Sequence, residues 1–140
     1  MKQVINISLF LFLTLTACQS SAEEITGKEI STTDGSYKDI TPAELDTMLS
    51  NREFILVNVH IPFAGNIADT DLSIPYDQIS APENLTQLPA DKDAKIILYC
   101  RSGRMSAIAA TELVSLGYTN IWNLEGGMVS WEQAGYSIEK

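Results

Sequence analysis

Short apolar runs alternate with helix-like segments along the second half of the chain. Residues 54–59 and 95–99 are nearly continuous runs of β-branched and other apolar residues, a pattern typical of strands covered on both faces. Residues 120–124 predict a further strand. The 60–80 segment holds two prolines and a small apolar patch, so we expect a long connection there with a short strand near Ile74.

Three helices are predicted around these strands. Thr41-Pro42-Ala43-Glu44 is a capping box with proline at the first helical position, so a helix should run to about residue 50. Between 105 and 116 the apolar residues follow helical spacing, and Gly117 supplies a left-handed cap. Residues 128–134 predict the last helix, which Gly135 ends. This alternation predicts a small α/β domain whose mainly parallel sheet is flanked by helices.

The first 17 residues have the pattern of a signal peptide. Lys2 precedes an apolar run at 4–15, which is shorter than the roughly 20 residues that a membrane-spanning helix needs. Leu15-Thr16-Ala17-Cys18 resembles the bacterial lipoprotein processing box. The resemblance implies that the chain is cleaved before Cys18 and that this cysteine carries lipid. The lipid would anchor the protein to a membrane of the cell envelope, outside the cytoplasm. With Gln19 as the next residue, this membrane would be the outer membrane in a Gram-negative cell. An uncleaved signal anchor is the alternative.

The segment after this cysteine differs from the rest of the chain. Residues 18–36 are polar, rich in Ser and Thr, and without apolar periodicity, which predicts a flexible, lipidated tether. We expect the folded domain over 37–140.

The chain is acidic. It has 9 Lys+Arg against 18 Asp+Glu and a net charge of −9; from residue 18 onward, with Lys2 removed, eight basic residues leave −10. We therefore expect no nucleic-acid partner. The single histidine, His60, has no companion metal ligands, so we expect no metal. His60 directly follows the predicted strand at 54–59, which we expect to lie beside the strand at 95–99. It could therefore lie on the rim of a site at the end of these strands, or be a structural histidine.

Cys100 stands where a predicted buried strand ends and a helix is about to begin. Ligands of parallel sheets collect at this end of the strands. Backbone N–H groups of the turn and the helix dipole stabilise a thiolate there, and Arg101 and Arg104 act in the same direction. Gly103 lets the backbone bend with positive φ. These residues predict a cradle for an anionic sulfur; a buried, unreactive cysteine is the alternative.

The cysteine loop and three other motifs resemble the rhodanese-like family. In chain order they are Tyr37-Lys38-Asp39-Ile40-Thr41, Tyr99-Cys100-Arg101-Ser102-Gly103-Arg104-Met105-Ser106, Leu116-Gly117-Tyr118 and Leu124-Glu125-Gly126-Gly127-Met128-Val129-Ser130-Trp131. The resemblance implies a three-layer α/β fold and a sulfurtransferase without metal or organic cofactor.

The chemistry that this resemblance implies is transfer of sulfane sulfur. Cys100 would take the outer sulfur of a small anionic donor such as thiosulfate as a persulfide and pass it to a thiol or cyanide. The loop residues that follow it would bind the substrate: Arg101 and Arg104 would attract the anion, Ser102 and Ser106 would donate hydrogen bonds, and Gly103 and Met105 complete the loop.

The sequence departs from the family pattern beside the predicted site. Asn58-Val59-His60 replaces the usual Asp-Val-Arg, which leaves open a sulfur-carrier or protein-binding module with low turnover. A redox-sensing thiol is a third hypothesis. The related dual-specificity phosphatases carry arginine where Ser106 stands, so phosphatase activity is not expected.

Overall fold

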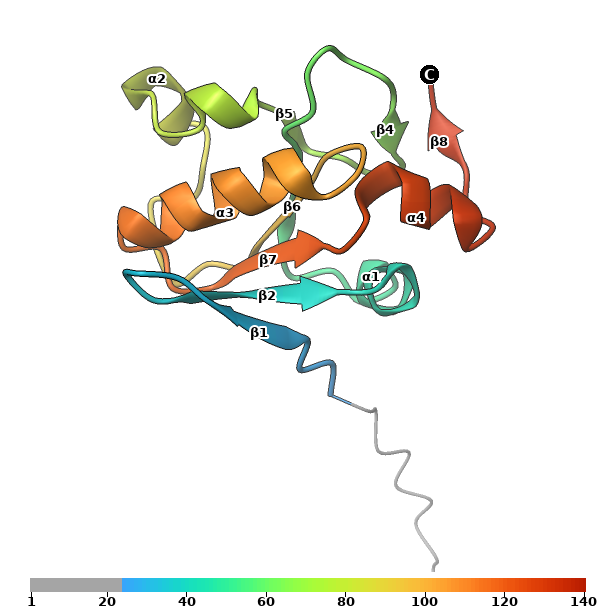
Figure 1. The fold of residues 1–140 in the computed structure, drawn as a ribbon, viewed down its shortest axis with the longest axis horizontal. Coiled ribbons are helices and arrows are strands. Elements are labelled where there is room, and N and C mark those ends of the chain that lie inside the picture. The colour runs from blue at the N-terminus through green and yellow to red at the C-terminus, as the bar shows by residue number, and fades with distance from the viewer. Residues whose placement is uncertain (1–23) are drawn as a thin grey trace, which may run out of the picture.

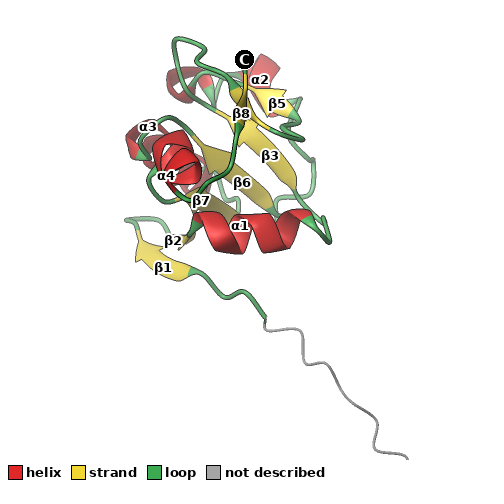
Figure 2. Ribbon diagram, turned by 90° about the vertical axis from the view of Figure 1, so that its right-hand side faces the viewer, coloured by secondary structure: helices red, strands yellow, loops and turns green. Residues whose placement is uncertain are grey.

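A computed structural model describes residues 24–140, which form a six-stranded sheet with helices on both faces (Figure 1). The strand order is β1-β2-β7-β6-β3-β5, and all neighbours run parallel except β1 and β2. The strands are β1 (Lys28–Ser31), β2 (Ser36–Ile40), β3 (Ile55–Asn58), β5 (Leu72–Ser73), β6 (Ile96–Tyr99) and β7 (Ile121–Leu124). The helices are α1 (Pro42–Leu49), α2 (Pro82–Leu85), α3 (Arg104–Ser115) and α4 (Gly127–Gln133). Figure 2 shows β7, β6 and β3 side by side in the centre of the domain.

The strands alternate their side chains between two apolar clusters. Val57 and Leu98 join the cluster that α3 and the segment around α2 cover, whereas Leu56 and Ile97 join the cluster that α1 and α4 cover. All four side chains are fully buried, as expected for central parallel strands with helices on both faces. The predicted three-layer α/β architecture with a mainly parallel sheet is confirmed.

The capping box predicted at residue 41 is present at the start of α1. The Glu44 N–H donates to Thr41 Oγ1 at 3.3 Å, and the Thr41 N–H donates to Glu44 Oε2 at 2.8 Å. Gly117, predicted to end the helix over 105–116, has φ of +91° and comes directly after Leu116, the C-cap of α3. Both helix boundaries were therefore readable from local chemistry.

The flexible tether predicted over 18–36 is wrong for residues 28–36. Residues 28–31 form β1, a turn follows, and residue 36 begins β2. β1 pairs antiparallel with β2 from Lys28↔Asp39 to Ser31↔Ser36. The pattern failed there because an edge strand exposed to water needs no apolar residues: in β1 only Ile30 packs on the core. The predicted signal peptide at 1–17 and Cys18 lie outside the described residues.

The long connection predicted after β3 contains more structure than expected. β4 (Asn66–Ile67) pairs antiparallel with β8 (Ile138–Glu139) in a second, two-stranded sheet. The expected short strand is β5 at 72–73, directly before Ile74, and a short 3-10 turn follows at Tyr76–Gln78. Within 24–140 no helix has the length and apolar character to cross a bilayer.

Candidate active site

Cys100 directly follows β6, which lies between β3 and β7 in the middle of the sheet. A three-residue loop leads from it into α3, and Gly103 takes φ of +96° immediately before the helix begins. A residue with a Cβ would be strained in this conformation. The sequence-predicted sharp turn between strand and helix is therefore present, and it places the thiol at the N-terminus of α3.

Two donors from the start of α3 face the sulfur. The Gly103 N–H donates to Cys100 Sγ at 3.0 Å, and the Ser106 hydroxyl lies 3.4 Å from the same sulfur and 3.2 Å from the Gly103 carbonyl oxygen. Ser106 is fully buried, and Cys100 is 1% exposed. Donors at a helix N-terminus stabilise negative charge, so the arrangement suits an anionic sulfur.

The glycine pair at the start of α4, Gly126 and Gly127, lets the backbone of that helix contact the cysteine loop. The N–H groups of Met128 and Val129 donate to the carbonyl oxygens of Cys100 and Arg101, each at 2.9 Å. A Cβ on Gly127 would lie 2.3 Å from the Cys100 oxygen, so only glycine permits this approach. From the sequence, these glycines were named only as part of a family motif, and their role in supporting the loop was missed. The signal was the pair of glycines itself, since two in succession indicate close backbone packing.

The two arginines of the loop point into different surroundings. Both are exposed. Arg101 lines a groove of about 490 Å³ with residues 63–65, Met128, Val129, Glu132, Ile138 and Lys140, which we call the α4 groove. Arg104 lines a separate hollow beside Tyr37 and the outer side of α3. The two arginine side chains thus line different hollows.

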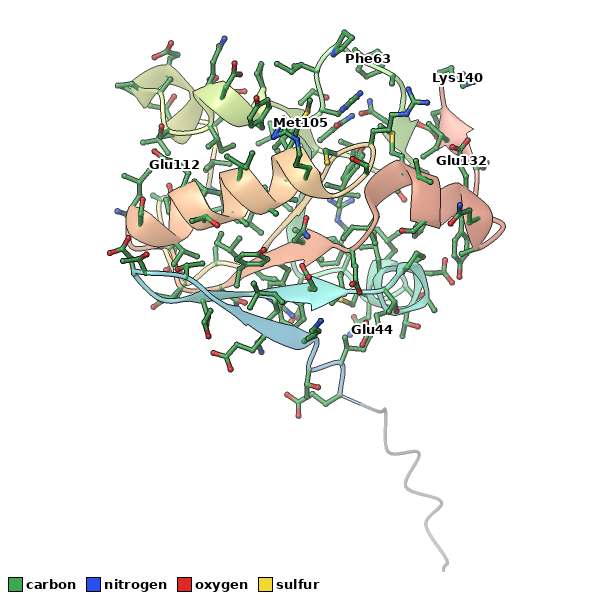
Figure 3. The ribbon with its side chains drawn as sticks, viewed as in Figure 1. Glu44, Phe63, Met105, Glu112, Glu132 and Lys140 are labelled. Atoms are coloured by element: carbon green, nitrogen blue, oxygen red, sulfur yellow. The ribbon has the colours of Figure 1, made fainter. Side chains whose placement is uncertain are left out.

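The other loop residues also occupy distinct positions. Ser102 is exposed. Met105 is half-buried against the apolar cluster under α3, and Figure 3 shows it on the first turn of that helix. Met105 therefore begins the apolar face of α3.

His60 lies two residues beyond the end of β3. This strand is the neighbour of β6, which leads into Cys100. β3 and β6 pair with Asn58 opposite Tyr99, so two further residues bring His60 level with Arg101. Burial, and then the Arg101 guanidinium, lower the pKa of His60. Its Nδ1 is buried and has no hydrogen-bond partner among residues 24–140. The imidazole therefore lies close enough to Arg101 of the cysteine loop for the two groups to interact electrostatically.

Asn58 organises the segment that follows β3. It is 2% exposed, and its side-chain oxygen accepts from the His60 N–H at 3.0 Å. Its amide nitrogen donates to the Gly65 carbonyl oxygen and to Asn66 Oδ1, both at 2.9 Å. From the sequence, Asn58 was noted only as a departure from the family pattern. In the structure its side chain hydrogen-bonds to both ends of the 60–66 loop.

Over residues 24–140, fold and site together define an α/β protein with one thiol, Cys100, at the N-terminus of α3. Residues 41–134 match the family model described as the rhodanese-like domain. This chain therefore belongs to the rhodanese-like family, as its motifs suggested. Among the residues that the structure describes, no group of three or more His, Cys, Asp or Glu could hold a metal ion.

Relatives with named functions include sulfurtransferases. Probable adenylyltransferase/sulfurtransferase MoeZ of Mycobacterium tuberculosis is 37% identical over 95 residues, which are 66% of this chain and 24% of that protein. A sulfurtransferase of Allochromatium vinosum is 31% identical over 93 residues, 65% of this chain and 83% of that one. The tRNA uridine(34) hydroxylase of Erwinia tasmaniensis is 30% identical over 115 residues, 79% of this chain and 32% of that one. The chain thus spans about a quarter of MoeZ. The names support a rhodanese-like, sulfur-related function and an enzyme of sulfurtransferase type.

Solved structures agree with the fold. The rhodanese-related protein of Thermoplasma volcanium has a TM-score of 0.60 and 30% identity, covering 73% of this chain and 97% of that one. A rhodanese-like domain protein of Staphylococcus aureus has a TM-score of 0.58 and 30% identity, covering 74% and 99%.

Proposed function

We propose that this protein transfers sulfane sulfur from a small anionic donor such as thiosulfate to a thiol or cyanide through a persulfide on Cys100. The observation that carries the proposal is the pair of donors on the sulfur, the Gly103 N–H at 3.0 Å and the Ser106 hydroxyl at 3.4 Å. These two donors face the sulfur that attacks the donor molecule and then carries the transferred sulfur.

The loading step follows from this geometry. The Cys100 thiolate attacks the outer sulfur of thiosulfate and forms a new S–S bond. The S–S bond of the donor breaks, and sulfite leaves with its electron pair. The negative charge now lies on the outer sulfur of the persulfide, and donors at the N-terminus of α3 stabilise it. The step moves one sulfur atom from thiosulfate to Cys100, so no additional oxidant or reductant is required.

Mass spectrometry of the protein treated with thiosulfate tests the proposal. We expect a gain of one sulfur atom on Cys100, absent from the Cys100→Ser variant. If thiosulfate, mercaptopyruvate and polysulfide all leave the mass of the folded protein unchanged, the proposal is overturned.

The near-complete burial of Cys100 bears on the two alternatives. At 1% exposure the thiol is poorly placed for a redox sensor, because oxidation of cysteine follows its exposure. The same burial favours a second candidate function, a sulfur carrier that transfers only when a partner protein docks. Rapid multiple turnover with cyanide as sole acceptor would exclude the carrier, and persulfide loading without turnover would support it.

We also propose that the protein is a lipoprotein of the cell envelope, attached through Cys18. The processing box and the short apolar run before it support this. In cells, the intact protein should sediment with membranes and the Cys18→Ser variant should be neither lipidated nor cleaved. Recovery of the unmodified protein, uncleaved and without lipid, would refute it.

A further inference from the structure

The α4 groove directly adjoins the cysteine loop and is much larger than the small ions considered above. Its volume of about 490 Å³ falls in the range of roughly 300–1,000 Å³ typical of organic ligand sites. Cyanide, with two heavy atoms, would leave nearly all of it empty. The groove therefore suits the body of an organic molecule, and Arg101, the residue directly after Cys100, is the part of the cysteine loop that lines it.

The walls of this groove are fixed relative to the sulfur. On one side, the Val129 N–H binds the Arg101 carbonyl oxygen at 2.9 Å. On the other, Gly65 packs so closely on β8 that a Cβ there would lie 2.7 Å from the Glu139 oxygen. Segments far apart in the sequence thus form a groove that exists before any ligand binds, which lowers the entropic cost of binding.

The groove presents apolar surface together with charges of both signs. Phe63 is 62% exposed and Val129 is 38% exposed. Arg101 and Lys140 supply positive charge and Glu132 supplies negative charge. The three have no ion pair within the described part of the chain, so their charges are available to a ligand. Figure 3 shows Phe63, Glu132 and Lys140 around one end of the molecule, whereas Glu112 lies at the far end of α3.

We propose that the α4 groove is the acceptor subsite and takes a zwitterionic thiol, an amino acid or short peptide with a free thiol. The carboxylate would bind between Arg101 and Lys140, the ammonium would face Glu132, and the apolar body would lie on Phe63 and Val129. This inference rests on the proposed sulfur transfer and names its acceptor class.

The transfer step balances without a further reactant. The acceptor thiol first loses its proton to water. Its thiolate attacks the outer sulfur of the Cys100 persulfide and forms a new S–S bond. The bond between the two persulfide sulfurs breaks, Cys100 leaves as a thiolate, and the acceptor departs as a persulfide.

Four small thiols separate the contributions of the two charges. Cysteine carries both charges, 3-mercaptopropionate only the carboxylate, cysteamine only the ammonium, and 2-mercaptoethanol neither. The protein is first loaded with thiosulfate, and loading is checked by mass. The second-order rate constant for loss of sulfur from Cys100, expressed per thiolate, is then measured for each thiol and for cyanide.

The expected pattern is specific to each variant. Cysteine should react fastest with the unaltered protein. Lys140→Gln should lower the rate constants for cysteine and 3-mercaptopropionate by about three- to fivefold and leave the rate constant for cysteamine unchanged. A factor of this size is expected for the loss of one solvent-exposed charge pair. Glu132→Gln should slow cysteine and cysteamine similarly and leave 3-mercaptopropionate unchanged. Neither should alter the cyanide rate.

Matched controls are Lys28→Gln on β1 and Glu112→Gln on α3, which change the same charges outside the groove. All four side chains are exposed, so the variants should fold. If the loaded protein reacts equally with all four thiols, or if the controls shift the rates as much as the groove variants, the acceptor subsite is refuted. Failure of thiosulfate, mercaptopyruvate and polysulfide alike to load the protein would instead refute the proposed sulfur transfer.

Discussion

Replacing Gly127 by alanine should separate the support of the cysteine loop from ordinary backbone strain. Gly127 has φ of +57°, and a Cβ there would lie 2.3 Å from the Cys100 oxygen and 2.7 Å from the Arg101 carbonyl carbon. Both are backbone atoms, so no side-chain rotation relieves the clash. Either the loop or the start of α4 must move.

The loss of stability has two parts. The left-handed conformation costs an alanine about 1–2 kcal/mol. Displacement also breaks the hydrogen bonds from Met128 and Val129 to the loop, each worth about 0.5–1.5 kcal/mol. Together these give about 2–5 kcal/mol, a large share of the roughly 5–15 kcal/mol that stabilises a typical domain.

Gly135→Ala is the matched control. Gly135 also has positive φ, +96°, but a Cβ there meets nothing within 4 Å, so only the conformational cost of about 1–2 kcal/mol applies. Urea unfolding followed by tryptophan fluorescence measures both variants. Persulfide loading should slow by about tenfold or more in Gly127→Ala alone, because the Cys100 backbone shifts under the sulfur. Equal destabilisation of the two variants, with unchanged loading in Gly127→Ala, would refute the role of Gly127.

Two substitutions and one titration test individual contacts. Ser106→Ala removes the hydroxyl 3.4 Å from Cys100 Sγ and should slow persulfide loading about two- to tenfold in the mass assay; an unchanged rate would contradict it. Tyr99→Phe leaves the buried Ile67 N–H without its partner at 3.1 Å and should lower the free energy of unfolding by about 1–3 kcal/mol, which an unchanged urea midpoint would rule out. Burial, then the neighbouring guanidinium, lower the pKa of His60, so its NMR signal should titrate below the ordinary value of about 6.5. Since the folded state resists this proton, its stability should fall as the pH drops through that region; titration at or above the ordinary value would contradict the expectation.

The sequence was informative where burial or local chemistry determines structure. β3, β6 and β7 were predicted because strands covered on both faces must be apolar at nearly every position. β1 was missed because its backbone pairing with β2 leaves most side chains in water. β8 was missed for a similar reason: it is two residues long, and only its distant partner β4 makes it a strand.

The same distinction applies to the candidate site. The position of Cys100 and the positive φ of Gly103 follow from the strand, turn and helix around them, and both were predicted. That Arg101 and Arg104 line different hollows was not predicted, since spacing along a loop does not determine which hollow an exposed side chain enters. Nor could spacing show that α4 holds the loop, because this contact joins segments that are distant in sequence.

The departure from the family pattern at Asn58 and His60 has a structural consequence away from the sulfur. The neutral Asn58 side chain is fully hydrogen-bonded to the 60–66 loop, so it needs no cationic partner in place of the usual arginine. That loop carries Phe63 and Gly65 into the α4 groove. The donors on Cys100 come instead from α3, where the sequence keeps the family motif. If the α4 groove is the acceptor subsite as proposed, it shares Arg101 with the cysteine loop but takes Phe63 and Gly65 from the 60–66 loop. We therefore expect this protein to differ from its relatives in its choice of acceptor rather than in the chemistry at Cys100.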